Sequence, residues 1–190
     1  MKKKIKILDC TLRDGGYYNN WNFDKNVVED YFKKINNSNI DVIEIGFRFL
    51  KKNSSLGPFA YSKENFIKKL KISKKIDVAV MINASDVIEL SKSMSHLNII
   101  KKFFTAKKNS VIKYFRVATH FSEIKIIIPF LRLINKNGYK VIVNIMQCSN
   151  KKYSDFKFVT DALNKLNFVK VLYFADSLGS MESEEVVRVS

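Results

Sequence analysis

The chain has 190 residues, 46% hydrophobic and 13% aromatic, which is enough for one substantial core and too little for two comfortable domains. No apolar run approaches the ~20 residues of a membrane-spanning helix, and the stretch before Asp9 is too short for a signal-peptide core, so a cytoplasmic protein without membrane contact is expected. The formal net charge of +16 would suit nucleic-acid binding, but the lysines are spread in pairs along the chain, which favours a solvated surface.

Six apolar runs with strand character recur along the chain, with polar segments of helical length between them. The apolar character of 78–82 and 141–146 fits strands that are covered on both faces, as in a parallel sheet beneath helices. Helical spacing of apolar residues supports helices over 27–35 and 124–134, and Asn137-Gly138 supplies a stop for the second. The predicted strands span residues 5–9, 41–46, 76–82, 112–119, 139–146 and 169–176.

This alternation predicts an α/β fold of repeated βα units. A closed (β/α)₈ barrel needs eight strands and ~250 residues, so the chain is expected to cover about the first six βα units of a TIM-type barrel, as one domain over 1–190 that is truncated at its C-terminus. A Rossmann-type open sheet is the competing architecture. It is disfavoured because no Gly-x-Gly-x-x-Gly follows any predicted strand.

Residues 9–16 read Asp-Cys-Thr-Leu-Arg-Asp-Gly-Gly directly after the first apolar run, so Arg13 and Asp14 are expected at the carboxyl end of the first strand. Catalytic groups of parallel barrels gather where strands end, and a carboxylate beside a fixed guanidinium could hold a divalent cation and an anionic oxygen together. A surface turn with a local ion pair is the alternative interpretation of Arg13-Asp14-Gly15.

Three further segments extend the pattern. Residues 43–46 (Ile-Glu-Ile-Gly), 116–120 (Arg-Val-Ala-Thr-His) and 175–181 (Ala-Asp-Ser-Leu-Gly-Ser-Met) each end a predicted strand. With residues 9–16, they resemble in order and spacing the DRE-TIM metallolyases, a superfamily that includes 4-hydroxy-2-oxovalerate aldolase, 3-hydroxy-3-methylglutaryl-CoA lyase and the isopropylmalate and homocitrate synthases. The strings at 116–120 and 175–181 are most similar to the hydroxy-oxovalerate aldolases.

The resemblance implies metal-dependent cleavage or formation of a carbon–carbon bond on a 2-oxo acid such as pyruvate. In such a site, Asp14 would bind Mn²⁺ or Mg²⁺, and Arg13 would steady the enolate oxygen. A metal and a guanidinium can both stabilise negative charge that develops on oxygen. A non-catalytic or regulatory aldolase-like domain is the first alternative, and an acyl-CoA-dependent synthase is the second.

Two departures from the family pattern motivate the non-catalytic alternative. The family's His-x-His metal pair is absent, since the chain has only His96 and His120, which are far apart in sequence. The aldolases place a histidine three residues after the metal aspartate, where this chain has Tyr17. With an ordinary pKa of ~10, a tyrosine is a poor base at neutral pH but a good hydrogen-bond donor. Residues 17–23 are expected to form an aromatic rim loop.

The remaining candidates follow other predicted strands. Glu44 is assigned to the catalytic group, where it would orient Arg13 or take part in proton transfer. His120 is expected at the catalytic rim, although a structural hydrogen-bonding role remains open. All of these side chains are expected to gather at one end of a parallel sheet. The predicted substrate-binding residues are Tyr17, Arg48, Thr119, Gln147, Asp176 and Ser177.

Predicted partners follow from the same pattern. A small 2-oxo acid is the expected ligand, and an open sheet edge after the sixth strand is expected to be covered by a second copy or a partner chain. Cys10 and Cys148 show no Cys-x-x-Cys spacing, so reduced thiols are expected and a zinc site or disulfide framework is unsupported.

Overall fold

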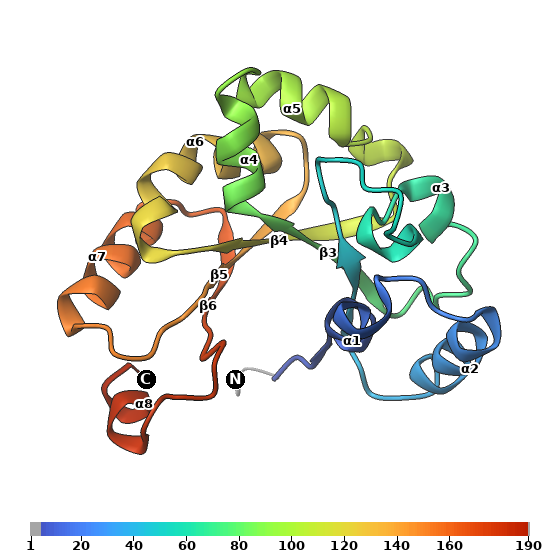
Figure 1. Ribbon diagram of the computed structural model, residues 1–190, viewed down its shortest axis with the longest axis horizontal. Helices are drawn as coiled ribbons and strands as arrows, with labels where there is room; N and C mark the ends of the chain where they lie inside the picture. The colour runs from blue at the N-terminus through green and yellow to red at the C-terminus, as the bar shows by residue number, and fades with distance from the viewer. Residues whose placement is uncertain (1–4, 190) are drawn as a thin grey trace. The chain divides into compact units, whose positions relative to one another are not determined.

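The computed structural model describes residues 5–189 and alternates strands with helices along the chain (Figure 1). Hydrogen bonds link the strands in chain order, from β1 to β6. The pairs β1–β2, β2–β3 and β5–β6 are parallel. This order is that of successive βα units in a TIM-like α/β fold. The strands are β1 (Leu8–Asp9), β2 (Val42–Phe47), β3 (Asp77–Asn83), β4 (Ile112–Thr119), β5 (Lys140–Ile145) and β6 (Val169–Phe174).

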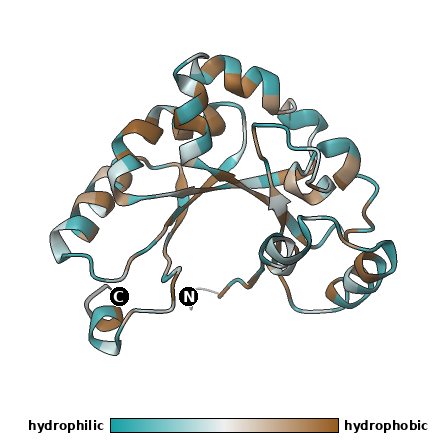
Figure 2. Cartoon of the chain, in the orientation of Figure 1, coloured by the Kyte–Doolittle hydropathy of each residue, from teal (hydrophilic) through white to brown (hydrophobic). Residues whose placement is uncertain are grey.

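Helices follow each strand along the chain, and they mix hydrophobic with hydrophilic segments (Figure 2). No helix among residues 5–189 is both long and apolar enough to cross a membrane. The α-helices are α1 (Thr11–Asn19), α2 (Lys25–Ile35), α3 (Glu64–Ile67), α4 (Ala84–Ser91), α5 (His96–Phe103), α6 (Ile124–Lys136), α7 (Tyr153–Asn164) and α8 (Ser183–Val189), and the 3₁₀ turns are η1 (Pro58–Ala60), η2 (Lys107–Asn109) and η3 (Phe121–Glu123).

The chain divides into two compact units. Unit 1 comprises residues 1–82 and 105–115, and unit 2 comprises residues 83–104 and 116–190. Unit 1 therefore contains β1 to β3 and the first half of β4, while unit 2 contains the second half of β4 together with β5 and β6. The expectation of a single domain stays a prediction.

Unit 1 is built on β2, in which all six residues are buried. The β-branched side chains of this strand suit a position covered on both faces. Helix α2 begins where the Asp24 carboxylate accepts hydrogen bonds from the backbone N–H groups of Asn26 and Val27. Its apolar stripe buries Val28 and Phe32. The predicted helix over 27–35 is thus confirmed and begins two residues earlier.

Gly46 permits a close approach between two segments of unit 1. A Cβ atom at this position would overlap the backbone carbonyl of Phe59 in η1. Only glycine lets the η1 segment lie against β2 in this way, which explains the residue type in the 43–46 string without a catalytic role.

Unit 2 is built on β5, β6 and the second half of β4. The backbone N–H of Met146 donates to the Thr119 carbonyl (2.9 Å), and that of Ala175 donates to the Ile145 carbonyl (2.8 Å), so the carboxyl ends of the three strands are tied together. Helix α6 buries five apolar residues. It ends at Lys136, with Asn137 as the C-cap and Gly138 in the left-handed region (φ 86°), as the sequence predicts.

The predicted α/β alternation is confirmed, with six strands among residues 5–189, whereas closure into an eight-stranded barrel stays a prediction. Two local expectations were wrong. The first strand is limited to Leu8–Asp9, because only these residues pair with β2. Residues 17–19, expected in a rim loop, complete helix α1, and the chain turns only at Asn20 and Trp21, both at φ 56°.

Candidate functional site

The start of α1 is fixed by Asp9, the last residue of β1. Its carboxylate accepts hydrogen bonds from the Thr11 backbone N–H (3.1 Å), the Thr11 hydroxyl (3.0 Å) and the Tyr31 hydroxyl (2.6 Å). Burial and this contact with Asp9 raise the pKa of Tyr31, so its hydroxyl remains a donor. The Asp9 contacts hold the first turn of α1, which carries Arg13 and Asp14, directly beyond the end of β1.

Arg13, Asp14 and Glu44 form one connected group. The Arg13 Nε donates to Glu44 Oε1 at 2.7 Å, and its Nη1 pairs with Asp14 Oδ1. The Glu44 side chain is fully buried and that of Arg13 is 13% exposed, whereas that of Asp14 is 52% exposed. The group therefore exposes the Asp14 carboxylate to solvent, while the buried Glu44 carboxylate holds the Arg13 guanidinium in place.

The charges of this group stabilise one another. Burial works against the charge on Arg13, but the Glu44 carboxylate outweighs it and raises the Arg13 pKa. The Cys10 thiol donates to Asp14 Oδ2 at 3.1 Å. Burial first, and then Asp14, raise the pKa of Cys10 to about 11, so the group is a thiol at neutral pH. Cys10 is a free, half-buried cysteine that lies between β1 and α1.

An aromatic frame holds the helix that carries Arg13. The Trp21 indole N–H donates to the Arg13 backbone carbonyl (2.9 Å), and its ring lies where a Cβ at Gly16 would be. The Phe47 ring packs edge-on against Trp21 (5.4 Å between centroids) and lies 5.9 Å from the Arg13 guanidinium carbon. This contact gives Gly16 a packing role, which the sequence motif alone does not reveal.

Tyr17 lies one turn of α1 beyond Arg13 and is 63% exposed. Its ring packs edge-on against Trp21 with 4.9 Å between centroids. Partial burial raises its pKa, although the charge of Arg13 acts in the opposite direction. The phenol is therefore neutral at physiological pH, so that Tyr17 can donate a hydrogen bond but is a poor base.

Arg48, predicted to bind substrate, is buried. Its Nη2 donates to the Ser62 carbonyl at 2.8 Å and lies 3.3 Å from Glu64 Oε1. The Arg48 guanidinium also lies 5.7 Å from the centre of the Phe115 ring. These contacts brace the segment between β2 and α3, and the substrate-binding role of Arg48 stays a prediction.

In unit 2, Thr119 and His120 lie at the carboxyl end of β4. The Glu123 carboxylate accepts hydrogen bonds from the His120 backbone N–H (2.8 Å) and from the Thr119 hydroxyl (3.2 Å). Thr119 is fully buried and His120 is half-buried. Glu123 was not among the predicted site residues, although a glutamate three residues after an N-cap position, here His120, is a common capping signal.

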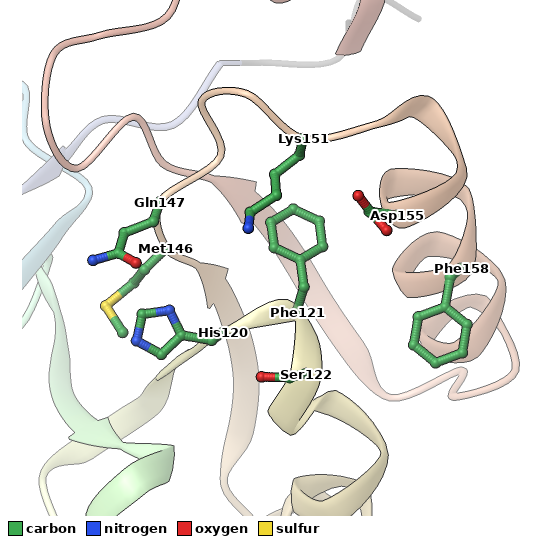
Figure 3. Close-up of a pocket in the computed structure, with 8 residues that line it drawn as sticks. All are labelled: His120, Phe121, Ser122, Met146, Gln147, Lys151, Asp155 and Phe158. Carbon is green, nitrogen blue, oxygen red and sulfur yellow. The ribbon is translucent and has the colours of Figure 1, made fainter.

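His120 lines a pocket of about 530 Å³ beyond the ends of β4 and β5 (Figure 3). The side chains of Gln147 and Lys151 extend toward the space above the His120 ring, and the Phe121 ring stands beside Lys151. The Lys151 ammonium lies 5.7 Å from the centre of that ring. The pocket combines a cation, an imidazole, an amide and aromatic walls, as small polar ligands require.

Gln147 and Ser177 are joined, because the Gln147 backbone N–H donates to the Ser177 hydroxyl at 3.1 Å. Gln147 has a φ of 56°, a backbone conformation that few residues other than glycine adopt. Gln147 lies two residues beyond β5 and lines the pocket from this position. The sequence flagged the residue type but could not reveal its backbone conformation.

Asp176 caps the loop that follows β6. Its carboxylate accepts hydrogen bonds from the backbone N–H groups of Met181 (2.9 Å) and Ser180 (3.0 Å), and these bonds lower its pKa. This geometry favours a structural role for Asp176 in holding the loop after β6. Direct substrate binding by Asp176 stays a prediction.

Three residues inside unit 2 form a polar group that the sequence interpretation largely missed. Arg116 on β4 donates from Nη2 to Asn144 Oδ1 on β5 at 2.6 Å, and its guanidinium lies 4.8 Å from the centre of the Tyr173 ring on β6. Arg116 and Asn144 are both buried. The signal was present as a charged residue and an amide inside two apolar strands, since buried polar groups need partners.

The predicted site residues thus fall into two groups. Arg13, Asp14, Tyr17 and Glu44 come together in unit 1, with Arg48 in a separate buried pair. That all candidates share one edge of a sheet stays a prediction. The candidates in unit 2 are Thr119, His120, Gln147, Asp176 and Ser177.

The described residues fit a divalent cation incompletely. Asp14 is a hard oxygen ligand with an exposed face, but one of its oxygens pairs with Arg13 and the other accepts from Cys10. Among residues 5–189, no group of three or more His, Cys, Asp or Glu side chains is arranged to hold a metal ion. Octahedral ions usually need several oxygen ligands, so Asp14 would leave most positions to water or to other groups.

No protein-family model and no curated protein matches the chain. Among solved structures, it is similar to the crystal structure of the N-terminal domain of a putative aldolase from Bacteroides vulgatus, with a TM-score of 0.62 and 25% sequence identity. The similarity covers 88% of this chain and 62% of the Bacteroides vulgatus chain, so the chain spans less than two thirds of that structure's length. The chain therefore has an aldolase-like fold.

Proposed function

We propose that the chain carries out aldolase-type cleavage or formation of a carbon–carbon bond on a 2-oxo acid. One observation carries the proposal: at the end of β1, the buried Glu44 fixes the Arg13 guanidinium beside the half-exposed Asp14 carboxylate. The likeness to an aldolase domain supports the same class of reaction at low identity. The resemblance of the strand-end strings to the DRE-TIM metallolyases, and to the hydroxy-oxovalerate aldolases within them, narrows the proposal to pyruvate enolate chemistry.

The reaction needs stabilisation of negative charge on one oxygen. In cleavage of a 4-hydroxy-2-oxo acid, a base removes the C4 hydroxyl proton and the C3–C4 bond breaks to release an aldehyde. The electron pair of that bond moves into the C2–C3 enolate, and a proton returned to C3 gives pyruvate. A guanidinium aimed at the C2 oxygen lowers the barrier because it is positioned before the charge develops.

Arg13 is the residue proposed to face the C2 oxygen, with Glu44 as its positioning residue. Since the Arg13 Nε donates to Glu44, the guanidinium plane is held while Nη1 pairs with the half-exposed Asp14 carboxylate. Tyr17, with its raised pKa, is proposed to donate a hydrogen bond to substrate. Arg48 is retained as a predicted substrate contact that would require its buried pair to open.

A divalent cation, Mn²⁺ or Mg²⁺, is proposed to bind at Asp14. When bound, such an ion would act as a Lewis acid on the substrate carbonyl. The donor set among the described residues is incomplete, so further ligands must come from water, substrate or other residues. No step above depends on the ion.

The pocket of unit 2 is proposed to bind substrate through His120 and Gln147 (Figure 3). Thr119, Asp176 and Ser177 would support it, because each bonds to backbone or side-chain groups around the strand ends. His120 is also the candidate for proton transfer, since an imidazole can both accept and donate a proton.

A homo-oligomer or a partner chain is proposed to cover β6. Among the described strands, β6 has β5 as its one neighbour, and Val171 and Tyr173 are exposed on it. Such an edge invites pairing with another strand. Light scattering on the purified chain should therefore give a mass above that of one 22.1 kDa chain.

The experiment that tests the proposed function measures binding and turnover separately. Oxalate, a planar dianion shaped like the pyruvate enolate, is titrated calorimetrically into the chain with and without Mn²⁺, and pyruvate release from 4-hydroxy-2-oxovalerate is followed. Arg13→Lys should weaken oxalate binding about tenfold, because a lysine cannot form the bidentate hydrogen bonds that a guanidinium makes to a carboxylate. Arg132→Lys, on an exposed residue of α6, is the matched control.

Unchanged oxalate affinity in Arg13→Lys would contradict the proposal. Turnover only with acetyl-CoA and a 2-oxo acid would favour the acyl-CoA-dependent synthase. Oxalate binding without turnover of either substrate would favour the non-catalytic alternative.

A further inference from the structure

Unit 1 has an apolar groove that the proposed reaction does not use. The groove has a volume of about 690 Å³ and lies between α2, η1 and α3 with the residues that follow α3. Phe59 and Phe32 form its buried floor, while Phe23, Phe66 and Leu70 are half-buried in its walls. Arg13, Asp14, Tyr17 and Glu44 do not line it.

The aromatic walls are rigidly packed. Phe59 contacts Phe66 edge-on at 4.7 Å and Phe23 edge-on at 5.2 Å between ring centroids. A preformed apolar cleft within the usual size range of small-molecule sites gains binding free energy from any apolar group that displaces water from it.

One end of the groove is basic. The Asn36 side-chain amide donates to the Lys71 carbonyl (2.6 Å), which ties the C-terminal end of α2 to the segment after α3. Lys33, in the last turn of α2, and Lys69 and Lys71 therefore line the groove near this end. Within residues 5–189, none of their ammonium groups forms an ion pair or hydrogen bond.

The charge at that end is net positive. A helix C-terminus carries roughly half a negative charge, which three ammonium groups exceed. Two acidic residues line the groove. Glu29 Oε1 lies 3.9 Å from the Nζ of Lys25, at the opposite end of α2, and Asp30 lies between Glu29 and Lys33 in the sequence. An anionic group is thus favoured at the Lys33 end and an apolar body along the rest of the groove.

We propose that this groove binds a small amphipathic anion, a medium-chain carboxylate, with its head at Lys33, Lys69 and Lys71 and its alkyl chain against Phe23, Phe59 and Phe66. Self-pairing of the groove across a two-fold axis would bring the lysines of two copies together, which like-charge repulsion opposes. Nucleic acid would meet the lysines but would leave the aromatic walls without an apolar partner.

The test uses the whole chain and decanoate as the probe, titrated calorimetrically below the concentration at which decanoate self-associates. Decanoate should bind, and octanoate should bind about fivefold more weakly, because two fewer methylene groups are buried in a half-open groove. Decyltrimethylammonium, with the same chain and a cationic head, should bind at least tenfold more weakly than decanoate.

Charge reversal locates the site. Lys33→Glu combined with Lys71→Glu should weaken decanoate binding at least tenfold. Lys74→Glu combined with Lys75→Glu, on exposed lysines outside the groove, should change it less than twofold. Leu70→Gln, which leaves the lysines in place, should weaken decanoate binding and abolish the preference over octanoate. Circular dichroism on each variant checks that the fold is kept.

Three results would overturn the proposal: no decanoate binding, equal binding to both charge-reversal variants, or equal affinity for decanoate and inorganic phosphate. A change in mass by light scattering with the Lys33/Lys71 variant, and none in decanoate affinity, would assign the groove to contacts between copies instead. Because oxalate binding at Arg13 is measured separately, neither outcome depends on the aldolase proposal.

Discussion

Unit 1 contains two arginine–carboxylate groups that look alike in sequence and differ in structure. Arg13 is held by the buried Glu44 and keeps a half-exposed partner, Asp14, at the surface. In the pair Arg48–Glu64, the two side chains are 5% and 7% exposed, and the Ser62 carbonyl takes a further guanidinium hydrogen. The first group is open to a ligand and the second is closed. An arginine near a strand end is therefore a site candidate only when its partners leave one side accessible.

The largest expected effect separates the two groups by stability. Glu64→Ala leaves the Arg48 guanidinium buried without its carboxylate partner. This should lower the free energy of unfolding by ~3 kcal/mol or more. Asp14→Asn removes an exposed charge and should cost less than ~1 kcal/mol. Urea denaturation of both variants measures the difference. Similar losses in the two would show that the Asp14 group is as closed as the Arg48 pair.

Oxalate affinity in Glu44→Gln and Glu64→Gln compares the two arginine–carboxylate groups directly. The Glu44→Gln substitution keeps the shape of the buried side chain but removes the charge that orients Arg13, so oxalate affinity should fall about tenfold, with ~2 kcal/mol lost in stability. Glu64→Gln, at the closed pair, should leave oxalate affinity within twofold. Calorimetric titration of both variants decides the matter, and an equal loss of affinity would remove the distinction.

Metal binding should depend on Asp14 and not on the Arg48–Glu64 pair. Asp14 supplies one strong oxygen ligand, so Mn²⁺ should bind on the order of millimolar or more weakly. Asp14→Asn should weaken Mn²⁺ binding at least threefold, and Glu64→Gln should not change it. Water-proton relaxation during a Mn²⁺ titration reports both. Tight binding that survives Asp14→Asn would place the ion elsewhere.

The closed pair should control acid stability. Burial alone would raise the pKa of Glu64, but the Arg48 charge, aided by a hydrogen bond from Thr105, lowers it below its ordinary value of 4.5. The stabilisation is therefore fully present above pH 4.5 and is lost as the pH falls through the lowered value. Unfolding free energies between pH 3 and 6 should fall less steeply in Glu64→Gln than in the unsubstituted chain. Equal slopes would contradict this assignment.

The smallest expected effect concerns His96, the first residue of α5, in unit 2. Burial lowers its pKa below 6.5, and its ring packs edge-on against Phe130 at 5.7 Å. The folded state favours the neutral ring, so its contribution is present above pH 6.5 and is lost as the pH falls below that value. In His96→Gln, the difference in unfolding free energy between pH 7.5 and pH 5.5 should therefore be smaller than in the unsubstituted chain. No change would show that the ring is solvated in the folded state.

The sequence by itself determined the alternation of strands and helices. The run 112–119 coincides with β4, and the runs at 41–46, 76–82 and 139–146 are within one residue of the observed strands at each end. Buried parallel strands need continuous apolar residues, and amphipathic helices need a fixed apolar spacing, so both patterns are local and can be read from the chain.

Tertiary structure decided the ends of elements and the state of each site residue. Gly15 and Gly16 disfavour a helix, yet α1 continues to Asn19, because Asp9 fixes its start and Trp21 packs where Gly16 has no side chain. Arg13 and Arg48 differ because their partners, Glu44 and Glu64, lie 31 and 16 residues away in sequence. Long-range contacts set burial, and burial decides whether a charged side chain can meet a ligand or is committed to the fold.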